Sequence, residues 1–167
     1  MTMGVPAITV RAATADDALG IAQVHVRSWR EAYARQLPAE VLAGLDVQRR
    51  AQVWTSIIES GDTTVCVAET DGPIVGWASA GAGRDGDAPV ALELEGIYLL
   101  ASAYGSGAGQ RLLDAVVGTA DAYLWVMADN PRAQAFYRRN GFAADGATKV
   151  EQVGEAAVEV VRFLRSS

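Results

Sequence analysis

Cysteine, histidine and lysine each occur once in this chain of 167 residues. Cys66 is the single cysteine and His25 the single histidine. An intramolecular disulfide is therefore excluded, and so is a metal site built from clusters of Cys and His. Lys149 is the one lysine among 14 basic residues, and the arginines are scattered. The sequence contains no basic patch of the kind that binds nucleic acid, and we expect no bound metal.

Long apolar runs are also missing. No uninterrupted apolar stretch reaches the roughly 18 residues of a membrane span, and residues 1–7 lack the basic and apolar regions of a signal peptide. Twenty acidic against 14 basic residues give a net charge of -6, which repels the phosphates of nucleic acids and of anionic membranes. We expect a cytoplasmic protein that binds neither nucleic acid nor a membrane.

The chain does contain enough apolar residues for a folded interior. Half of its residues are hydrophobic, and its length is close to the commonest size of a single domain. It has no repeats, no low-complexity tract and no linker long enough to divide it. We therefore expect residues 1–167 to form one domain.

The spacing of apolar residues predicts a mixed α/β sheet with helices on both faces. The predicted strands cover residues 8–11, 64–69, 74–80, 91–100, 123–127, 148–153 and 158–164. The predicted helices cover residues 15–33, 41–58, 110–117 and 130–140. Gly96 lies inside the strand 91–100, where a glycine marks a bulge or a close backbone approach. We expect a kink there.

A glycine-rich segment joins that strand to the next helix. It reads Gly105-Ser106-Gly107-Ala108-Gly109-Gln110. Backbone amides at the start of a helix form an anion-binding site, and glycines let a diphosphate reach them. A Walker loop is excluded because it needs a lysine, and a Rossmann fingerprint fails because Gln110 and Leu112 occupy its last glycine position. The alternative is that these glycines only make a tight connection.

A second motif extends from Asn130 to Phe142. Asn130 is a capping residue, Pro131 suits the first helical position, and Gly141 suits the end of the helix. Phe136 and Tyr137 are adjacent, so they cannot both face the core. One of the two is a candidate to face a ligand.

Three motifs, Ile97-Tyr98-Leu99, Gly105 to Gly109 and Asn130 to Phe142, together resemble the acetyl-CoA-binding core of the GNAT superfamily of N-acetyltransferases. The resemblance implies a single α/β (α+β) domain with a mixed, mostly antiparallel sheet and a splayed central strand pair. It implies direct transfer of an acetyl group from acetyl-CoA to a primary amine of a small molecule or peptide. GNAT proteins are often dimers, so a homodimer is possible. The alternative is a noncatalytic acyl-CoA-binding or interaction module on the same fold.

The resemblance also implies roles for individual residues. Ile97, Tyr98 and Leu99 match the strand whose backbone pairs with pantetheine and polarises the thioester. The residues that match the pyrophosphate loop are Gly105, Ser106, Gly107, Ala108, Gly109 and Gln110. Asn130 matches an asparagine that contacts the cofactor, and Tyr137 matches a tyrosine near the CoA sulfur. The family often has a basic residue in place of Ser106 and Gln or Arg in place of Tyr104, so we expect backbone amides to carry more of the binding here.

An amine attacks a thioester only after its ammonium form has lost a proton, so a base is required. Glu93 and Glu95 lie two residues apart on the strand 91–100, which places them on one face if the strand is regular. Either could be the base, and the resemblance slightly favours Glu93, since similar GNAT sequences often read Glu-Leu-x-x-Leu-Tyr-Val there. The alternative is that both are solvated. Some relatives carry a carboxylate in the following strand, where this chain has Trp125.

Aromatic residues recur on the first predicted helix. His25, Trp29 and Tyr33 follow one another at intervals of four residues and therefore share one face. In GNAT folds the first two helices border the acceptor groove, so these three residues are candidates for substrate binding. The alternative, that they pack into the core, is equally consistent with the pattern.

Overall fold

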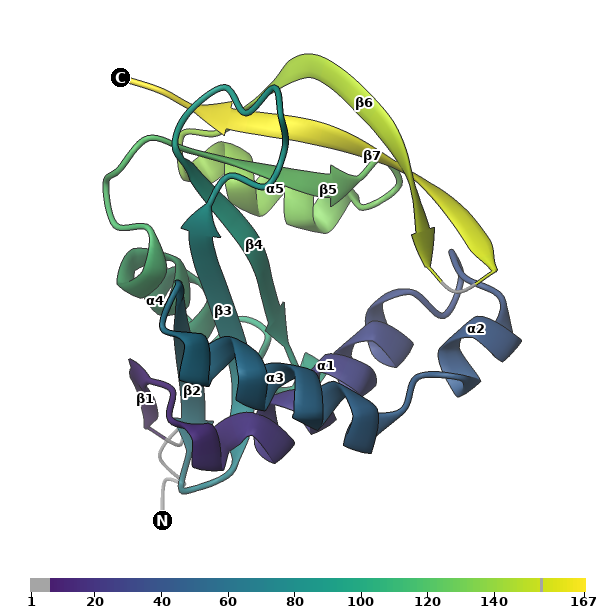
Figure 1. Ribbon diagram of the computed structural model, residues 1–167, viewed down its shortest axis with the longest axis vertical. Coiled ribbons are helices and arrows are strands. Elements are labelled where there is room, and N and C mark those ends of the chain that lie inside the picture. Colours follow the sequence, from purple (N-terminus) through teal and green to yellow (C-terminus); the bar gives the residue numbers. More distant parts are fainter. Residues whose placement is uncertain (1–6, 154) are drawn as a thin grey trace.

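The structure, a computed structural model, describes residues 7–153 and 155–167 (Figure 1). In this part of the chain seven strands form one sheet in the order β1-β2-β3-β4-β5-β7-β6. They are β1 (Ile8–Ala12), β2 (Thr63–Thr70), β3 (Ile74–Ala82), β4 (Leu92–Leu99), β5 (Ala122–Met127), β6 (Ala143–Val153) and β7 (Ala156–Arg165). Neighbouring strands are antiparallel except β4 and β5, which are parallel. The predicted mixed and mostly antiparallel sheet is confirmed.

Helices cover both faces of this sheet, as predicted. They are α1 (Ala18–Ala32), α2 (Ala39–Ala43), α3 (Val47–Ser60), α4 (Ala108–Val116) and α5 (Pro131–Arg139). Side chains alternate between the faces of a strand, and β2 shows this directly. Its Val65 and Val67 belong to the cluster that includes α1 and α3, whereas Cys66 and Ala68 belong to the cluster that includes α4.

Some predicted boundaries were wrong for local reasons. The single helix predicted over 41–58 is two helices, because the Asp46 side chain accepts hydrogen bonds from the amides of Gln48 and Arg49 and so caps a new helix, α3. The strand predicted from 148 begins at Ala143, since the β6–β7 pairing continues through an irregularity between Ala144 and Thr148. Apolar spacing shows neither a cap nor an irregular register.

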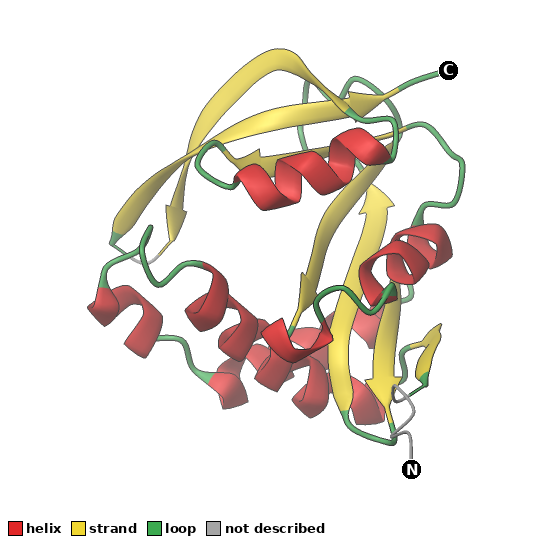
Figure 2. Cartoon of the chain, turned by 180° about the vertical axis from the view of Figure 1, so that it is seen from behind, coloured by secondary structure: helices red, strands yellow, loops and turns green. Residues whose placement is uncertain are grey.

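The parallel strands β4 and β5 pair only at Glu93 and Tyr123 and then diverge (Figures 1 and 2). On the other side of β4, Ser79 pairs with Gly96 and Ala80 with Leu94, so Glu95 is an extra residue that forms a β-bulge. A bulge bends and twists its strand. The kink expected at Gly96 is confirmed, one residue earlier, and the splayed strand pair is confirmed with it.

Gly96 allows aromatic rings to approach the bent strand closely. A Cβ atom at this position would lie 3.1 Å from ring carbons of both Trp77 and Tyr98. Real Cβ atoms rarely tolerate so short a contact with rings that are themselves packed. Glycine is therefore the residue that lets these two rings lie against β4 beside the bulge.

Candidate functional site

A cleft of about 990 Å³ opens where β4 and β5 separate. Its walls come from α1 and the residues after it, β4, β5, the segment before α4, the start of α5, and the facing ends of β6 and β7. The predicted site residues that line it are His25, Trp29, Tyr33, Glu95, Ile97, Tyr98, Leu99, Gly105, Gly107, Gly109, Gln110, Asn130 and Tyr137. Glu93, Ser106 and Ala108 are not among the lining residues.

The glycine-rich segment presents free backbone amides to the cleft. Gly105 and Gly107 have φ values of +76° and +85°, in the left-handed region that favours glycine. Within the described residues, the amides of Gly105, Gly107, Gly109 and Gln110 donate no hydrogen bond to the protein. A Cβ at Gly105 or Gly107 would meet no protein atom within 4 Å, so the space beside the segment is open. These amides at the start of α4 can hold an anion.

Ser106 and Ala108, predicted to contact the cofactor, shape the segment instead. The Ser106 hydroxyl donates to the carbonyl of Ala103 at 2.5 Å and accepts from the amide of Ala108 at 3.2 Å. Hydroxyls in turns often satisfy neighbouring backbone groups in this way. Ala108 is fully buried against the core. Their contribution is to fix the conformation that frees the neighbouring amides.

Two arginines that the sequence analysis missed lie beside this segment. Arg132 and Arg139 of α5 line the cleft, and the Arg132 guanidinium lies 3.3 Å from the ring centroid of Tyr104. Asn130 caps the same helix by accepting a hydrogen bond from the Ala133 amide at 3.2 Å. The motif predicted α5, but only its packing beside α4 shows that the two cations face the cleft. The two arginines supply positive charge beside a segment in which the uncharged Ser106 supplies none.

Strand β4 directs alternate backbone groups into the cleft. The Leu100 amide donates to the carbonyl of Val75 on β3 at 2.9 Å. Successive amides of an extended strand point in opposite directions, so the Leu99 amide points away from β3. On that side β5 has already diverged. The Leu99 amide is therefore available to a ligand in the cleft.

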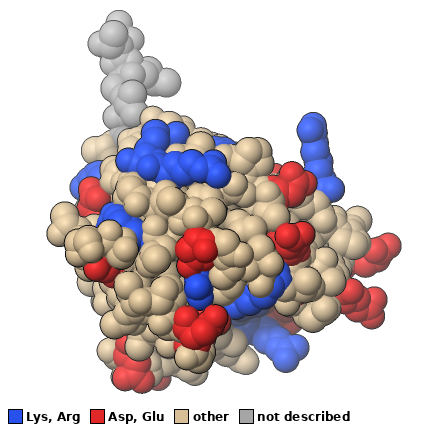
Figure 3. Space-filling model, turned by 90° about the horizontal axis from the view of Figure 1, so that it is seen from above, with Lys and Arg blue, Asp and Glu red and all other residues tan. Residues whose placement is uncertain are grey.

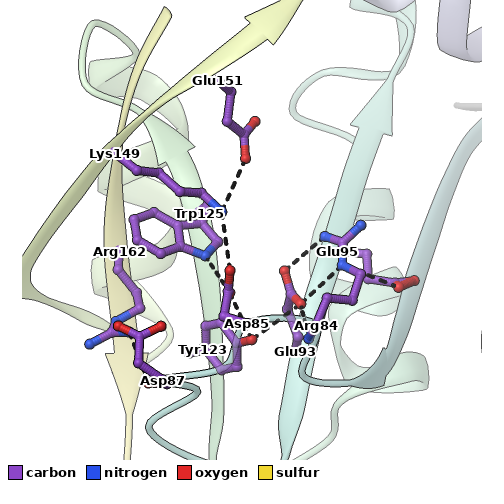
Figure 4. Close-up of polar contacts among 10 residues, drawn as sticks. All are labelled: Arg84, Asp85, Asp87, Glu93, Glu95, Tyr123, Trp125, Lys149, Glu151 and Arg162. Atoms are coloured by element: carbon purple, nitrogen blue, oxygen red, sulfur yellow. Dashed lines mark hydrogen bonds and ion pairs between the residues drawn. The ribbon is translucent and has the colours of Figure 1, made fainter.

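Glu93, the slightly favoured base, is engaged elsewhere (Figure 4). Its side chain is 2% exposed, and it accepts from Arg84 through Nε at 3.0 Å, through Nη2 at 2.8 Å and through the backbone amide at 3.0 Å. The Tyr123 hydroxyl, whose single proton has a shorter contact with Asp85 at 2.9 Å, also lies 3.3 Å from the Glu93 carboxylate. These donors occupy the carboxylate oxygens, and Glu93 does not line the cleft where an amine would lie. The geometry disfavours Glu93 as the base.

Glu95 has the surroundings that a base needs. It lines the cleft, and its carboxylate lies 3.9 Å from the Arg84 Nε, beyond hydrogen-bond distance. Burial raises its pKa above the ordinary value, and the charge of Glu93 raises it further, whereas Arg84 and Ser79 lower it. The bulge explains how the two glutamates come to differ, because the extra residue turns Glu95 toward the open side of β4.

Tyr137 keeps its phenolic proton at neutral pH. Burial raises its pKa above the ordinary value of 10, and the neighbouring Tyr33 raises it further. The ring packs edge-to-face against Phe142 and Phe163, with centroids 6.0 and 6.5 Å apart. Both Phe136 and Tyr137 line the cleft. The Tyr137 ring therefore packs against neighbouring aromatic rings, and Tyr137 also lines the cleft.

His25 lies in an aromatic cluster at the cleft. Its ring stacks on Trp77, Trp29 and Tyr98, with centroids 5.3, 5.6 and 5.9 Å apart. Burial lowers the pKa of His25 from 6.5 to about 3, and the charge of Arg50 contributes. The imidazole is neutral at pH 7, which rules out a charged role. The residues of this face line the cleft and also pack together, and substrate binding by them stays a prediction.

The lowered pKa of His25 predicts acid sensitivity. Below pH 6.5 the unfolded chain binds a proton at His25 that the folded chain does not bind until about pH 3. Stability is therefore lost as the pH falls through this window, by up to about 1.4 kcal/mol per pH unit from this group. We expect urea denaturation of His25→Phe between pH 4.5 and 6.5 to show a smaller loss than wild type. Equal losses in the two proteins would contradict the assignment.

A polar network ties the β3–β4 connection to the far side of the sheet (Figure 4). Asp85 accepts from the Trp125 indole at 2.8 Å, the Tyr123 hydroxyl at 2.9 Å and Lys149 at 3.3 Å. These contacts lower the pKa of Asp85, the Trp125 hydrogen bond most. They hold the two diverging strands at a fixed separation, and they fix Trp125, which lines the cleft. The sequence marked this segment only as a loop.

None of the helices in the described residues is long and apolar enough to cross a membrane. On the face seen in Figure 3, acidic and basic side chains are interspersed. The net charge of -6 is therefore not gathered into one patch on that face.

Comparisons with known proteins agree with this geometry. A family model described as "Acetyltransferase (GNAT) family" matches residues 22–142. The chain is 34% identical over 131 residues to the uncharacterized N-acetyltransferase YuaI of Bacillus subtilis (strain 168), which covers 74% of each chain. It is 31% identical over 115 residues to an uncharacterized N-acetyltransferase of Mycobacterium tuberculosis (strain ATCC 25618 / H37Rv), which covers 65% of this chain and 71% of the relative.

Solved structures share the fold. The PaiA N-acetyltransferase of Thermoplasma acidophilum, solved with coenzyme A, superimposes with a TM-score of 0.69 at 18% identity, covering 93% of this chain and 98% of that one. The YncA acetyltransferase of Salmonella typhimurium, solved with acetyl-CoA, has a TM-score of 0.65 at 19% identity, covering 95% and 92%.

Proposed function

The chain belongs to the GNAT family of acetyltransferases, and on that basis we propose that it transfers the acetyl group of acetyl-CoA to a primary amine held in the cleft. One observation carries the proposal. The free amides at the start of α4, the Glu95 carboxylate and Tyr137 all border a single cavity. Acetyl-CoA supplies the acetyl group, activated as a thioester.

The residues of this chain suit the binding of a CoA diphosphate. Four unpartnered amides lie at the positive end of α4, where anions are stabilised. Arg132 and Arg139 add two cations on the neighbouring helix. The open space beside Gly105 and Gly107 leaves room for the phosphate groups.

The protein groups then divide the proton transfers between them. A C–N bond forms and a C–S bond breaks, so the amine must lose a proton and the departing sulfur must gain one. Glu95 takes the proton from the ammonium group, because its raised pKa makes it a better base than an ordinary glutamate. Tyr137 donates to the sulfur. The Leu99 amide stabilises the negative charge that develops on the carbonyl oxygen, a contribution typically of about 3 kcal/mol.

The Gly107→Val variant tests whether the glycine-rich segment binds CoA. We expect calorimetry to show CoA binding weakened by about tenfold or more, since a side chain would cover the free amides and φ of +85° disfavours valine. Gly61→Val is the matched control, because Gly61 also has a positive φ, +72°, and open space, and it does not line the cleft. Equal CoA affinity in the two variants would argue against binding of CoA by the glycine-rich segment.

A turnover screen tests the activity itself. Release of the CoA thiol is followed while acetyl-CoA is mixed with amines of different classes, and the acetylated product is identified by mass spectrometry. Amine-dependent release supports an acetyltransferase. Binding of CoA without amine-dependent release from any class would favour the noncatalytic module.

A further inference from the structure

The cleft has a part distinct from the glycine-rich segment. It is bounded by the end of α1, the residues after α1, β5 and β7, and we call it the acceptor arm. Six of its lining residues are Trp29, Tyr33, Leu37, Trp125, Met127 and Val158. The arm is therefore lined by aromatic and aliphatic side chains, which favour an apolar ligand.

The aromatic walls of the acceptor arm are held in place. The Trp125 indole donates to Asp85 at 2.8 Å, and the Lys149 ammonium lies 4.2 Å from its ring centroid. Trp29 and Tyr33 pack edge-to-face with centroids 5.1 Å apart. Rings fixed in this way form a surface that an apolar or aromatic group can contact with little loss of side-chain entropy.

One side of the acceptor arm is enclosed. Leu37, which follows α1, belongs to a single hydrophobic cluster with Val158 and Val160 of β7. The Gln36 side chain also donates to the carbonyl of Asp129 at 3.3 Å. The same approach is visible in Figures 1 and 2, where the α1–α2 region meets the β6–β7 end of the sheet. The acceptor arm is therefore closed on this side.

The charges around the cleft do not suit a polycation. The charged lining residues are Glu31, Glu95 and Glu151 together with Arg50, Arg84, Arg132 and Arg139. Arg132 and Arg139 lie beside the glycine-rich segment, so the rest of the cleft has three glutamates together with Arg50 and Arg84, and what matters there is whether those glutamates already have partners. A ligand with several ammonium groups would need several unpaired carboxylates.

All three cleft carboxylates have a cationic neighbour, and that of Glu95 is the most distant. Glu31 accepts from Arg27 at 3.0 Å, and Glu151 lies 3.4 Å from the Lys149 ammonium. Glu95 lies 3.9 Å from Arg84, which is bound to Glu93. Glu95 is therefore the carboxylate best able to receive an ammonium group, and it can receive only one.

We propose that the acceptor is a small primary monoamine with an aromatic body, an arylalkylamine in chemical class. Its ammonium group faces Glu95 and its ring occupies the acceptor arm. This inference rests on the proposed acetyl transfer and adds the kind of amine to it. Polyamines are poor acceptors, since their further ammonium groups find no free carboxylate in the acceptor arm.

A panel of four acceptors tests the proposal with the wild-type enzyme. They are 2-phenylethylamine, 1,6-diaminohexane, spermidine and a tripeptide with a free amino group. We expect kcat/KM for 2-phenylethylamine to exceed each of the others by about tenfold or more, a ratio typical of discrimination by an apolar pocket. An equal or higher value for the diamine, spermidine or the tripeptide would overturn the proposal.

Variants of Met127 test whether the acceptor arm sets this preference. Met127→Glu places a carboxylate in the acceptor arm in addition to Glu95 of the cleft. The preference for 2-phenylethylamine over 1,6-diaminohexane should therefore fall by about tenfold. Met127→Gln controls for polarity and should change the preference much less. Val150→Glu adds the same charge at a residue that is 63% exposed and outside the cleft, and should leave the preference unchanged. Equal preferences in Met127→Glu and Val150→Glu would contradict the assignment of the arm.

Failure of this inference differs from failure of the proposed function. If no amine is acetylated, binding of the amines to the CoA-loaded protein is measured by saturation-transfer NMR. Tighter binding of 2-phenylethylamine than of 1,6-diaminohexane would still support the arm while rejecting catalysis. Acetylation with the reverse preference would keep the enzyme and reject the acceptor class.

Discussion

Glu95→Gln should lower kcat/KM for acetyl transfer by about 100-fold or more near pH 7, because a glutamine cannot take the proton of the attacking ammonium. The amide keeps the shape of the side chain, so CoA affinity and folding should change little. Stopped-flow or steady-state release of the CoA thiol measures the rate, and calorimetry with CoA checks the binding. Full activity in this variant would remove Glu95 from the mechanism.

The pH dependence makes this prediction more specific. Because the pKa of Glu95 is raised, the wild-type rate should fall with acidification at a higher pH than an ordinary glutamate would give. The group must be ionised to act, so the rate increases with pH through that pKa. The rate of Glu95→Gln should not show this fall on the acid side of the pH profile (the acid limb). An unchanged acid limb in the variant would assign the titration to another group.

Glu93→Gln is the informative companion variant. Glu93 holds Arg84 through a bidentate pair, and removing its charge frees Arg84 to approach Glu95. The pKa of Glu95 should then fall, so the acid limb should shift to lower pH and the rate should drop moderately. The double variant Glu93→Gln/Arg84→Gln should move the limb back up. If Glu93 were itself the base, its single variant would instead lose the limb altogether.

Tyr137→Phe should reduce kcat by about 100-fold while leaving the affinity for CoA nearly unchanged. The phenol supplies the proton that the departing sulfur needs, and its raised pKa keeps it protonated at neutral pH. The ring remains to pack against Phe142 and Phe163, so a loss of rate with unaltered stability would identify the hydroxyl as the cause. Thiol release and thermal unfolding together make the measurement.

Tyr33→Phe and Phe136→Leu are the controls for this prediction. Tyr33 also lines the cleft with a buried phenol whose pKa is raised by burial, so it is the natural competitor for the role. We expect Tyr33→Phe to affect KM for the amine more than kcat. Phe136→Leu changes the neighbouring ring without removing a hydroxyl. A larger fall in kcat for Tyr33→Phe than for Tyr137→Phe would transfer the acid role to Tyr33.

Much of the proposed cofactor-binding part of the site could be predicted, because backbone amides rather than side chains form it. Glycine at Gly105 and Gly107 is needed for positive φ, and free amides at a helix start follow from local sequence alone. Arg132 and Arg139 were missed, since a helical pattern does not tell which exposed side chains another helix will border. The same limit applies to Ser106, whose hydroxyl turned back to Ala103.

The two candidate bases show what a local sequence pattern cannot predict. The sequence placed Glu93 and Glu95 on one face of a strand and could not separate their roles. The structure does so through contacts from distant segments, since Arg84 and Tyr123 bind Glu93 while the bulge turns Glu95 to the cleft. Trp125 lines the cleft, and its indole is held by Asp85, 40 residues away in sequence.

The sequence by itself determined the order of the strands, the kink beside Gly96 and the glycine-rich turn before α4, because hydrophobic periodicity and glycine conformation act over a few neighbouring residues. Only the tertiary structure decided which glutamate is free, which arginines face the cleft and what the acceptor arm can hold. Those properties depend on burial and on charges from strands and loops far apart in the chain, and the free energy of an ionised group is set by such surroundings.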